Sequence, residues 1–123
     1  LRLTETLWGL VPALIFPLIG HRTGAQQAFT LALTNQAIDG ERAVAIGLAD
    51  QFASDPADAL RRFGRNLGRS EAGAARALKQ HYRALFPVEI DPRGASTRLL
   101  LERLAAPAFA ERTMRLRAAG VLP

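Results

Sequence analysis

The sequence predicts a mostly α-helical chain that begins with one buried apolar segment, and three observations support this. Apolar residues recur at helical spacing over most of the chain after residue 24. Residues typical of helix starts and stops separate these stretches. Charge is uneven, because only three of the first 38 residues are charged. The 123 residues, 49% of them hydrophobic, suit a single domain with a modest core.

The apolar segment covers residues 7–20 and contains no charge. It is shorter than the roughly 20 apolar residues of a membrane span, and Pro12 and Pro17 interrupt it. A signal peptide would be followed by a small-x-small cleavage site, but His21 and Arg22 come next. We therefore expect burial against protein, no membrane partner and a soluble, cytoplasmic protein. The bias toward alanine and toward arginine, with 15 arginines and one lysine, is typical of a GC-rich bacterial genome.

Two helices and a short strand are expected next. Residues 24–34 form a helix with Ala28, Leu31 and Ala32 on one face. Asp39 caps a short second helix, which ends at Gly47 with a Schellman contact from Leu48. Its inward residues are expected to be Ala43, Val44 and Ile46. Residues 48–52 then suit a short strand.

The remaining chain predicts further helices, five or six in all. Asp55-Pro56 starts one, with an apolar stripe at Leu60, Phe63 and Leu67 and a basic stripe at Arg61, Arg65 and Arg69. Ser70 caps the next, which carries Leu78, Tyr82 and Leu85 on one side and stops at Pro87. Asp91-Pro92 opens another with Leu100, Leu101 and Leu104 inward; Pro107 interrupts it, and the last helix runs to Gly120.

Several kinds of site are excluded by what the sequence lacks. Without cysteine there is no disulfide framework, thiolate zinc site or cysteine nucleophile. There is no nucleophile elbow, phosphate-binding glycine loop or paired histidine at metal spacing, and no metal site is predicted. His21 and His81 lie far apart without obvious partners, and Tyr82 is read as core.

Glu5 is the candidate catalytic residue. It is the only acidic residue among the first 38 and directly precedes the apolar segment. Apolar surroundings disfavour the charged form of a carboxylate, which suits it to general acid–base work. A surface or helix-capping glutamate is the alternative interpretation.

The residues around Glu5 resemble a known family. The segment 4–12, TETLWGLVP, is similar to the P-E-x-x-x-G-x-x-P segment of the crotonase (enoyl-CoA hydratase/isomerase) superfamily. Similarity continues through Leu18-Ile19-Gly20, Gly24 and Ala28, then through residues 33–34, 38–43 and 47–50. Thr4 replaces the family's first proline, and residues 12–17, PALIFP, replace its P-G-A-G-G-T stretch. These departures and the closing GVLP resemble the dehydratases of polyketide β-branching cassettes.

The resemblance implies an α/β crotonase fold of ββα spiral turns, of which this chain is the mostly helical C-terminal half. Residues 1–53 would be the end of the crotonase core, and residues 54–123 a helical region for oligomerisation and active-site cover. It implies a hydro-lyase that removes water from a 3-hydroxy-3-methylglutaryl-type thioester on an acyl carrier protein. Glu5 would protonate the departing hydroxyl. The implied substrate-binding residues are Thr4, Trp8, Leu10, Pro12 and Ala13, with Gly9 as the structural turn.

The implied partners follow from the same resemblance. No cofactor is expected, because the substrate arrives as a coenzyme A or phosphopantetheine thioester. The oxyanion-hole loops and a first carboxylate belong to an N-terminal half that this chain does not contain, so alone it is expected to be inactive and to expose residues 7–20. A homotrimer or hexamer is expected. The stripe of Arg61, Arg65 and Arg69 is either a solvated face or a docking site for the acidic carrier.

Two alternatives remain open. One is a general enoyl-CoA hydratase or isomerase of fatty-acid metabolism. The other is a non-catalytic helical binding module, for which nucleic acid is the partner to consider, given the net charge of +5 and 15 arginines. The arginines are scattered and aromatics make up only 7% of the chain, so a nucleic-acid partner is not expected.

Overall fold

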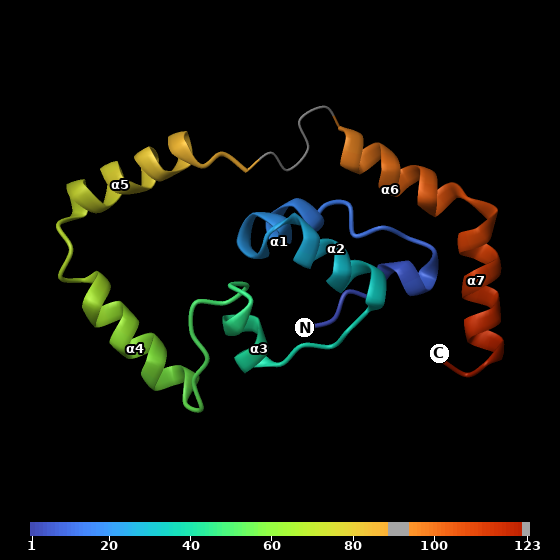
Figure 1. Cartoon of the computed structure of the whole chain (residues 1–123), viewed down its shortest axis with the longest axis horizontal. Helices are drawn as coiled ribbons and strands as arrows, with labels where there is room; N and C mark the ends of the chain where they lie inside the picture. The colour runs from blue at the N-terminus through green and yellow to red at the C-terminus, as the bar shows by residue number, and fades with distance from the viewer. Residues whose placement is uncertain (89–93, 122–123) are drawn as a thin grey trace.

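A computed structural model describes residues 1–88 and 94–121 of the chain (Figure 1). It contains a short 3-10 helix, η1, and seven α-helices, with no strand in these two ranges. In chain order they are η1 (Glu5–Trp8), α1 (Phe16–Thr23), α2 (Ala25–Thr34), α3 (Gly40–Ala45), α4 (Pro56–Leu67), α5 (Ala72–Leu85), α6 (Ala95–Ala105) and α7 (Pro107–Ala118). The mostly helical prediction is confirmed: within the described residues six α-helices, α2 to α7, follow the apolar segment as expected, and α1 is an additional helix that begins within that segment.

Residues 1–48, called here the body, contain the core. Helix α1 packs against α2, and η1 packs against the other end of α2. The buried cluster consists of Leu3, Ile19, Ala28, Leu31, Ala32 and Ile38. The predicted face of α2 is confirmed, since three of these six residues form it. The chain start is tied down beside the core, because Leu1 and Ile38 exchange two backbone hydrogen bonds of 2.8 and 2.9 Å.

The apolar segment 7–20 is less buried than its pattern predicts and closer to the exposure that the resemblance implies. It ends in helix α1, and Pro17 is accommodated in the first turn, where a missing backbone N–H costs nothing. Ala13 and Ile19 are buried, whereas Leu14, Ile15 and Leu18 stay exposed by 47%, 42% and 38%. Burial against the chain's own residues is therefore partial, which agrees with the expected exposure of this segment.

Helix α3 is built as the sequence indicates. The Asp39 carboxylate accepts the Arg42 N–H at 2.8 Å and caps it. Gly47 is left-handed (φ +76°), and the N–H groups of Gly47 and Leu48 bond back to Val44 and Ala43 in a Schellman motif. Of the residues predicted to face inward, Ala43 and Ile46 pack on the core, but Val44 is 36% exposed.

The predicted strand at residues 48–52 is wrong. The segment stays against the body, where Asp50 pairs with Arg22 at 2.6 Å, but no strand occurs in either described range to pair with it. An isolated strand would leave its backbone N–H and C=O groups without partners, so this segment remains irregular.

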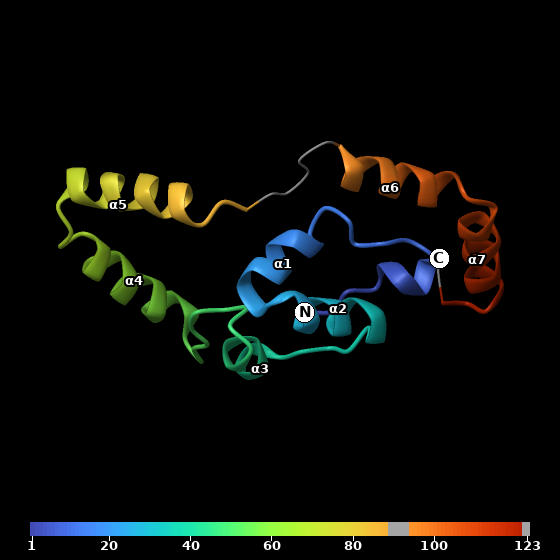
Figure 2. The same cartoon turned by 45° about the horizontal axis from the view of Figure 1, so that its top comes forward.

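Helices α4 to α7 form two arms: α4 and α5 make the first, and α6 and α7 the second (Figures 1 and 2). Asp55 caps α4 as predicted, through the Asp58 N–H at 3.0 Å. The predicted Ser70 cap of α5 is wrong. Glu71 caps this helix, because its carboxylate accepts from the N–H groups of Gly73 and Ala74 at 2.7 and 2.6 Å. The predicted start at Asp91-Pro92 lies outside the described residues, and α6 begins after Gly94.

The apolar faces of the arms stay open. Leu60, Leu78 and Tyr82 are exposed by 71%, 68% and 50%, so Tyr82 is not a core residue. The inward placement predicted for Leu101 and Leu104 is also wrong, at 59% and 42% exposed, while Leu100 is half-buried. Helix α6 contacts α7 and reaches the body through Arg103, which bonds to the Gly9 carbonyl. Within the two described ranges, no helix combines the length and apolarity needed to cross a membrane.

Candidate active site

Glu5 is the first residue of η1 and lies at the edge of the body. The residue is half-buried, and its Oε2 atom is buried without a hydrogen-bond partner among the described residues. Buried carboxylate oxygens normally accept hydrogen bonds, because an unpaired one loses its hydration without compensation. Among the described residues, Oε2 of Glu5 is therefore an unsatisfied buried acceptor.

The backbone around Glu5 is fixed by a second Schellman motif. Gly9 is left-handed (φ +79°), a conformation that glycine adopts without strain. Its N–H donates to the Thr6 carbonyl at 3.2 Å, and the Leu10 N–H donates to the Glu5 carbonyl at 2.9 Å. The turn at Gly9 thus holds the main chain of Glu5 directly.

Thr6 fastens this turn to α2. Its hydroxyl lies 3.0 Å from the Ala32 carbonyl and 3.1 Å from Oδ1 of Asn35, the buried left-handed residue that ends α2. Arg2 adds a bond from Nε to the Asn35 carbonyl at 2.7 Å. The Glu5 segment is consequently seated on the most buried helix of the body.

Two cavities flank the segment. One, of about 420 Å³, is almost entirely apolar and lies between the chain after η1, helices α1 and α2, and the start of α6. Pro12 and Ala13, two of the predicted substrate-binding residues, line it together with Phe16, Phe29 and Leu99. An apolar cavity of this size suits a short acyl group.

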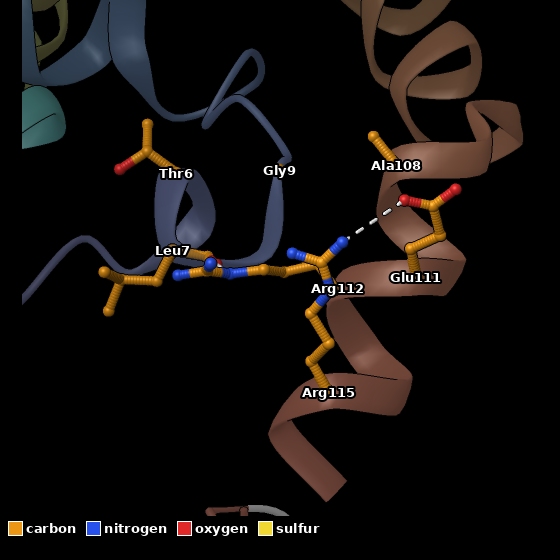
Figure 3. A pocket seen from close by; sticks show the side chains of 7 residues that line it. All are labelled: Thr6, Leu7, Gly9, Ala108, Glu111, Arg112 and Arg115. Atoms are coloured by element: carbon orange, nitrogen blue, oxygen red, sulfur yellow. Dashed lines mark hydrogen bonds and ion pairs between the residues drawn. The ribbon is translucent and has the colours of Figure 1, made fainter. Parts of the chain in front are cut away.

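The second cavity, of about 410 Å³, lies between η1 and α7 (Figure 3). Gly9 lines it with Thr6 and Leu7, opposite Glu111, Arg112 and Arg115. Arg115 and Glu111 form an ion pair at 3.7 Å. Thr6 lines both cavities. Glu5, Thr4, Trp8 and Leu10 line neither, although all four are half-buried next to them.

Sequence reasoning missed the two arginines that contact the Glu5 segment from the second arm. Arg103 of α6 donates from Nε to the Gly9 carbonyl, and Arg112 of α7 donates from Nε to the Leu7 carbonyl, both at 2.8 Å. No sequence pattern could reveal these bonds, since 94 and 105 residues separate the partners. The acceptors are backbone carbonyls, which every residue has, so the residue types at positions 7 and 9 do not indicate them.

The remaining candidate residues, the histidine His21 and the basic stripe of α4, lie away from Glu5. His21 Nε2 lies 3.2 Å from the Tyr82 hydroxyl, which joins α1 to α5 and gives this histidine a partner that the sequence did not suggest. Arg61 and Arg62 both pair with Asp58, so the basic stripe is partly neutralised at Arg61. No group of acidic and histidine side chains suited to a metal ion occurs in residues 1–88 and 94–121.

No protein-family model matches the chain, and no curated protein is similar enough to be matched to it. Support for a function of this chain therefore comes from the resemblance of residues 4–50 and from the geometry around Glu5.

Proposed function

We propose that the chain is the C-terminal part of a crotonase-superfamily hydro-lyase. It would dehydrate a 3-hydroxy-3-methylglutaryl-type thioester on an acyl carrier protein, with Glu5 as a catalytic residue. The observation that carries this proposal is the buried Oε2 of Glu5, which has no hydrogen-bond partner among the described residues. The next residue, Thr6, lines the apolar cavity. A structural glutamate would instead be expected to pair or to face solvent.

The proposed reaction balances as an elimination. A base takes the proton α to the thioester carbonyl, and the electron pair becomes an enolate. Collapse of the enolate forms the carbon–carbon double bond and breaks the β carbon–oxygen bond. Protonated Glu5 gives its proton to the departing hydroxyl, which leaves as water. Backbone N–H donors that stabilise the enolate are required as well, and in this proposal they come from the N-terminal half of the family fold.

The surroundings of Glu5 support this role physically. The left-handed Gly9 turn and the Thr6 contacts hold its main chain in place. Preorganisation of this kind keeps a catalytic group at its working position without cost at the moment of reaction. The cavity lined by Pro12 and Ala13 offers an apolar site for the acyl chain.

The test is Glu5→Gln in the natural protein that contains this chain, with carrier-linked 3-hydroxy-3-methylglutaryl substrate. We expect kcat to fall by about 10²- to 10⁴-fold, since the amide cannot donate the proton. Glu41→Gln is the matched control, because Glu41 is exposed on α3. Activity of Glu5→Gln close to that of the control would remove Glu5 from the mechanism.

The substrate class needs a separate comparison. Rates with carrier-linked and coenzyme A-linked substrates should favour the carrier. A strong preference for short 3-hydroxyacyl-coenzyme A would instead establish the general hydratase of fatty-acid metabolism. The absence of turnover with every thioester, combined with tight salt-sensitive binding to nucleic acid, would establish the helical binding module.

A further inference from the structure

We infer that Arg103 and Arg112 are positioning residues that clamp the Glu5 segment from the second arm. The clamp consists of the two bonds to the carbonyls of Gly9 and Leu7. Its structural part stands on geometry alone, while its effect on turnover rests on the proposed function of Glu5.

The carbonyls at the end of a short helix explain why arginines suit this place. A helix leaves its last carbonyl groups without partners inside the helix, and the helix dipole makes that end partially negative. In η1 the Schellman motif uses the carbonyls of Glu5 and Thr6. The next carbonyls needing donors include those of Leu7 and Gly9, and each receives a charged guanidinium N–H, a stronger donor than a neutral one.

The two bonds act on one turn from two helices. Arg103 lies near the end of α6 and Arg112 in the middle of α7, on opposite sides of the break at Pro107. Their acceptors are two residues apart and flank Trp8. Figure 3 shows Arg112 extended from α7 along η1 to Leu7. Two anchors on separate helices resist rotation of the turn, which a single bond would permit.

The clamp reaches Glu5 through the main chain. The Glu5 carbonyl accepts a hydrogen bond from the Leu10 N–H. Leu10 follows Gly9, whose carbonyl accepts from Arg103. Release of either arginine frees the end of η1 and lets the Glu5 carboxylate leave its buried position. Helices α6 and α7 thus determine where the candidate catalytic group lies, although neither contains it.

Trp8 provides a direct reporter, because it is the only tryptophan of the chain and lies between the two clamped residues. The experiment measures Trp8 emission and its quenching by acrylamide in Arg103→Ala, Arg112→Ala and the double variant. We expect a red-shifted emission and stronger quenching, greatest in the double variant, with helix content unchanged in far-UV circular dichroism. Arg117→Ala on α7 is the control, since Arg117 is exposed.

The second readout is turnover, measured for the same variants in the natural protein that contains this chain. We expect kcat to fall by about 10- to 100-fold in the double variant through misplacement of Glu5. Lysine at both positions keeps a cationic donor, so quenching and kcat should recover part of the way toward the wild-type values.

The outcomes separate the clamp from the proposed function. Trp8 quenching equal to the Arg117→Ala control in the double alanine variant overturns the clamp. If the alanine variants unfold, Arg103→Met combined with Arg112→Met decides, because methionine keeps an unbranched side chain but has no N–H donor. Quenching equal to that of the control in this variant overturns the clamp. Altered Trp8 quenching together with wild-type turnover of Glu5→Gln would retain the clamp and reject the catalytic role of Glu5.

Discussion

The body and the two arms carry similar amphipathic helices but use them differently. In residues 1–48 the apolar faces of α1 and α2 meet, and the buried hydrophobic residues of the described ranges all lie between Leu3 and Ile38. In α4 and α5 the apolar stripes are as regular, yet Leu60, Phe63 and Leu78 remain more than half exposed. In Figure 1 the arms lie around the outside of the body, and hydrogen bonds such as His21–Tyr82 and Arg112–Leu7 join them to it.

The difference shows that an apolar stripe on a helix forms a core only where another element packs against it. Helices α4 and α5 have 12 and 14 residues, lengths at which isolated helices are marginal in water. Their order depends on caps and helix propensity, whereas α2 is stabilised by burial. Side-chain truncations should therefore matter in the body, and cap changes should matter most in the arms.

The largest expected effect compares two leucines. Leu31→Ala removes a side chain that is 3% exposed in the centre of α2, and we expect the free energy of unfolding to fall by about 2–5 kcal/mol. Leu60→Ala on α4 removes one that is 71% exposed and should change it by less than about 0.5 kcal/mol. Urea denaturation of both variants measures the contrast. A comparable loss at Leu60 would mean that the first arm packs against another surface in solution.

A smaller effect compares two glycines. Gly47→Ala puts a side chain at φ +76°, and its Cβ would lie 3.2 Å from the Arg22 carbonyl oxygen. We expect destabilisation by about 1–2 kcal/mol. Gly64→Ala lies within α4 with open space around it, and better helix propensity should stabilise α4 by up to about 1 kcal/mol. Thermal unfolding followed by circular dichroism should give opposite signs, and equal signs would contradict the comparison.

The smallest expected effect is the acid sensitivity of α5. The N–H groups of Gly73 and Ala74 stabilise the Glu71 carboxylate and hold its pKa below the ordinary value. A group with a lowered pKa in the folded state stabilises at neutral pH, and that contribution is lost as the pH falls through the folded pKa. Helix content should therefore drop on acidification more in the wild type than in Glu71→Gln.

Ser70→Ala serves as the control for this titration, because Ser70 does not cap the helix. Far-UV circular dichroism between neutral and acid pH provides the measurement. An identical acid response in wild type and Glu71→Gln, or a large effect of Ser70→Ala, would show that the cap belongs elsewhere.

Local signals predicted the elements that depend on neighbouring residues. Asp39, Asp55 and Gly47 act where their residue types indicate, because capping and left-handed turns involve atoms only a few residues apart. The wrong cap at Ser70 also concerns neighbouring residues. Both Ser70 and Glu71 could cap the helix, and the longer Glu71 side chain reaches two N–H groups. The predicted strand failed because pairing requires a partner that local pattern cannot supply.

Sequence alone determined that this chain is mostly helical, where its buried face on α2 lies, and that Glu5 begins the segment that merits testing. Tertiary structure decided the rest. It buried the Glu5 Oε2 without a partner among residues 1–88 and 94–121, left the arm faces exposed to solvent, and brought Arg103 and Arg112 to the Gly9 turn. The physical reason is one of range: caps and periodicity act within a few residues, whereas burial and carbonyl contacts depend on which distant segments meet.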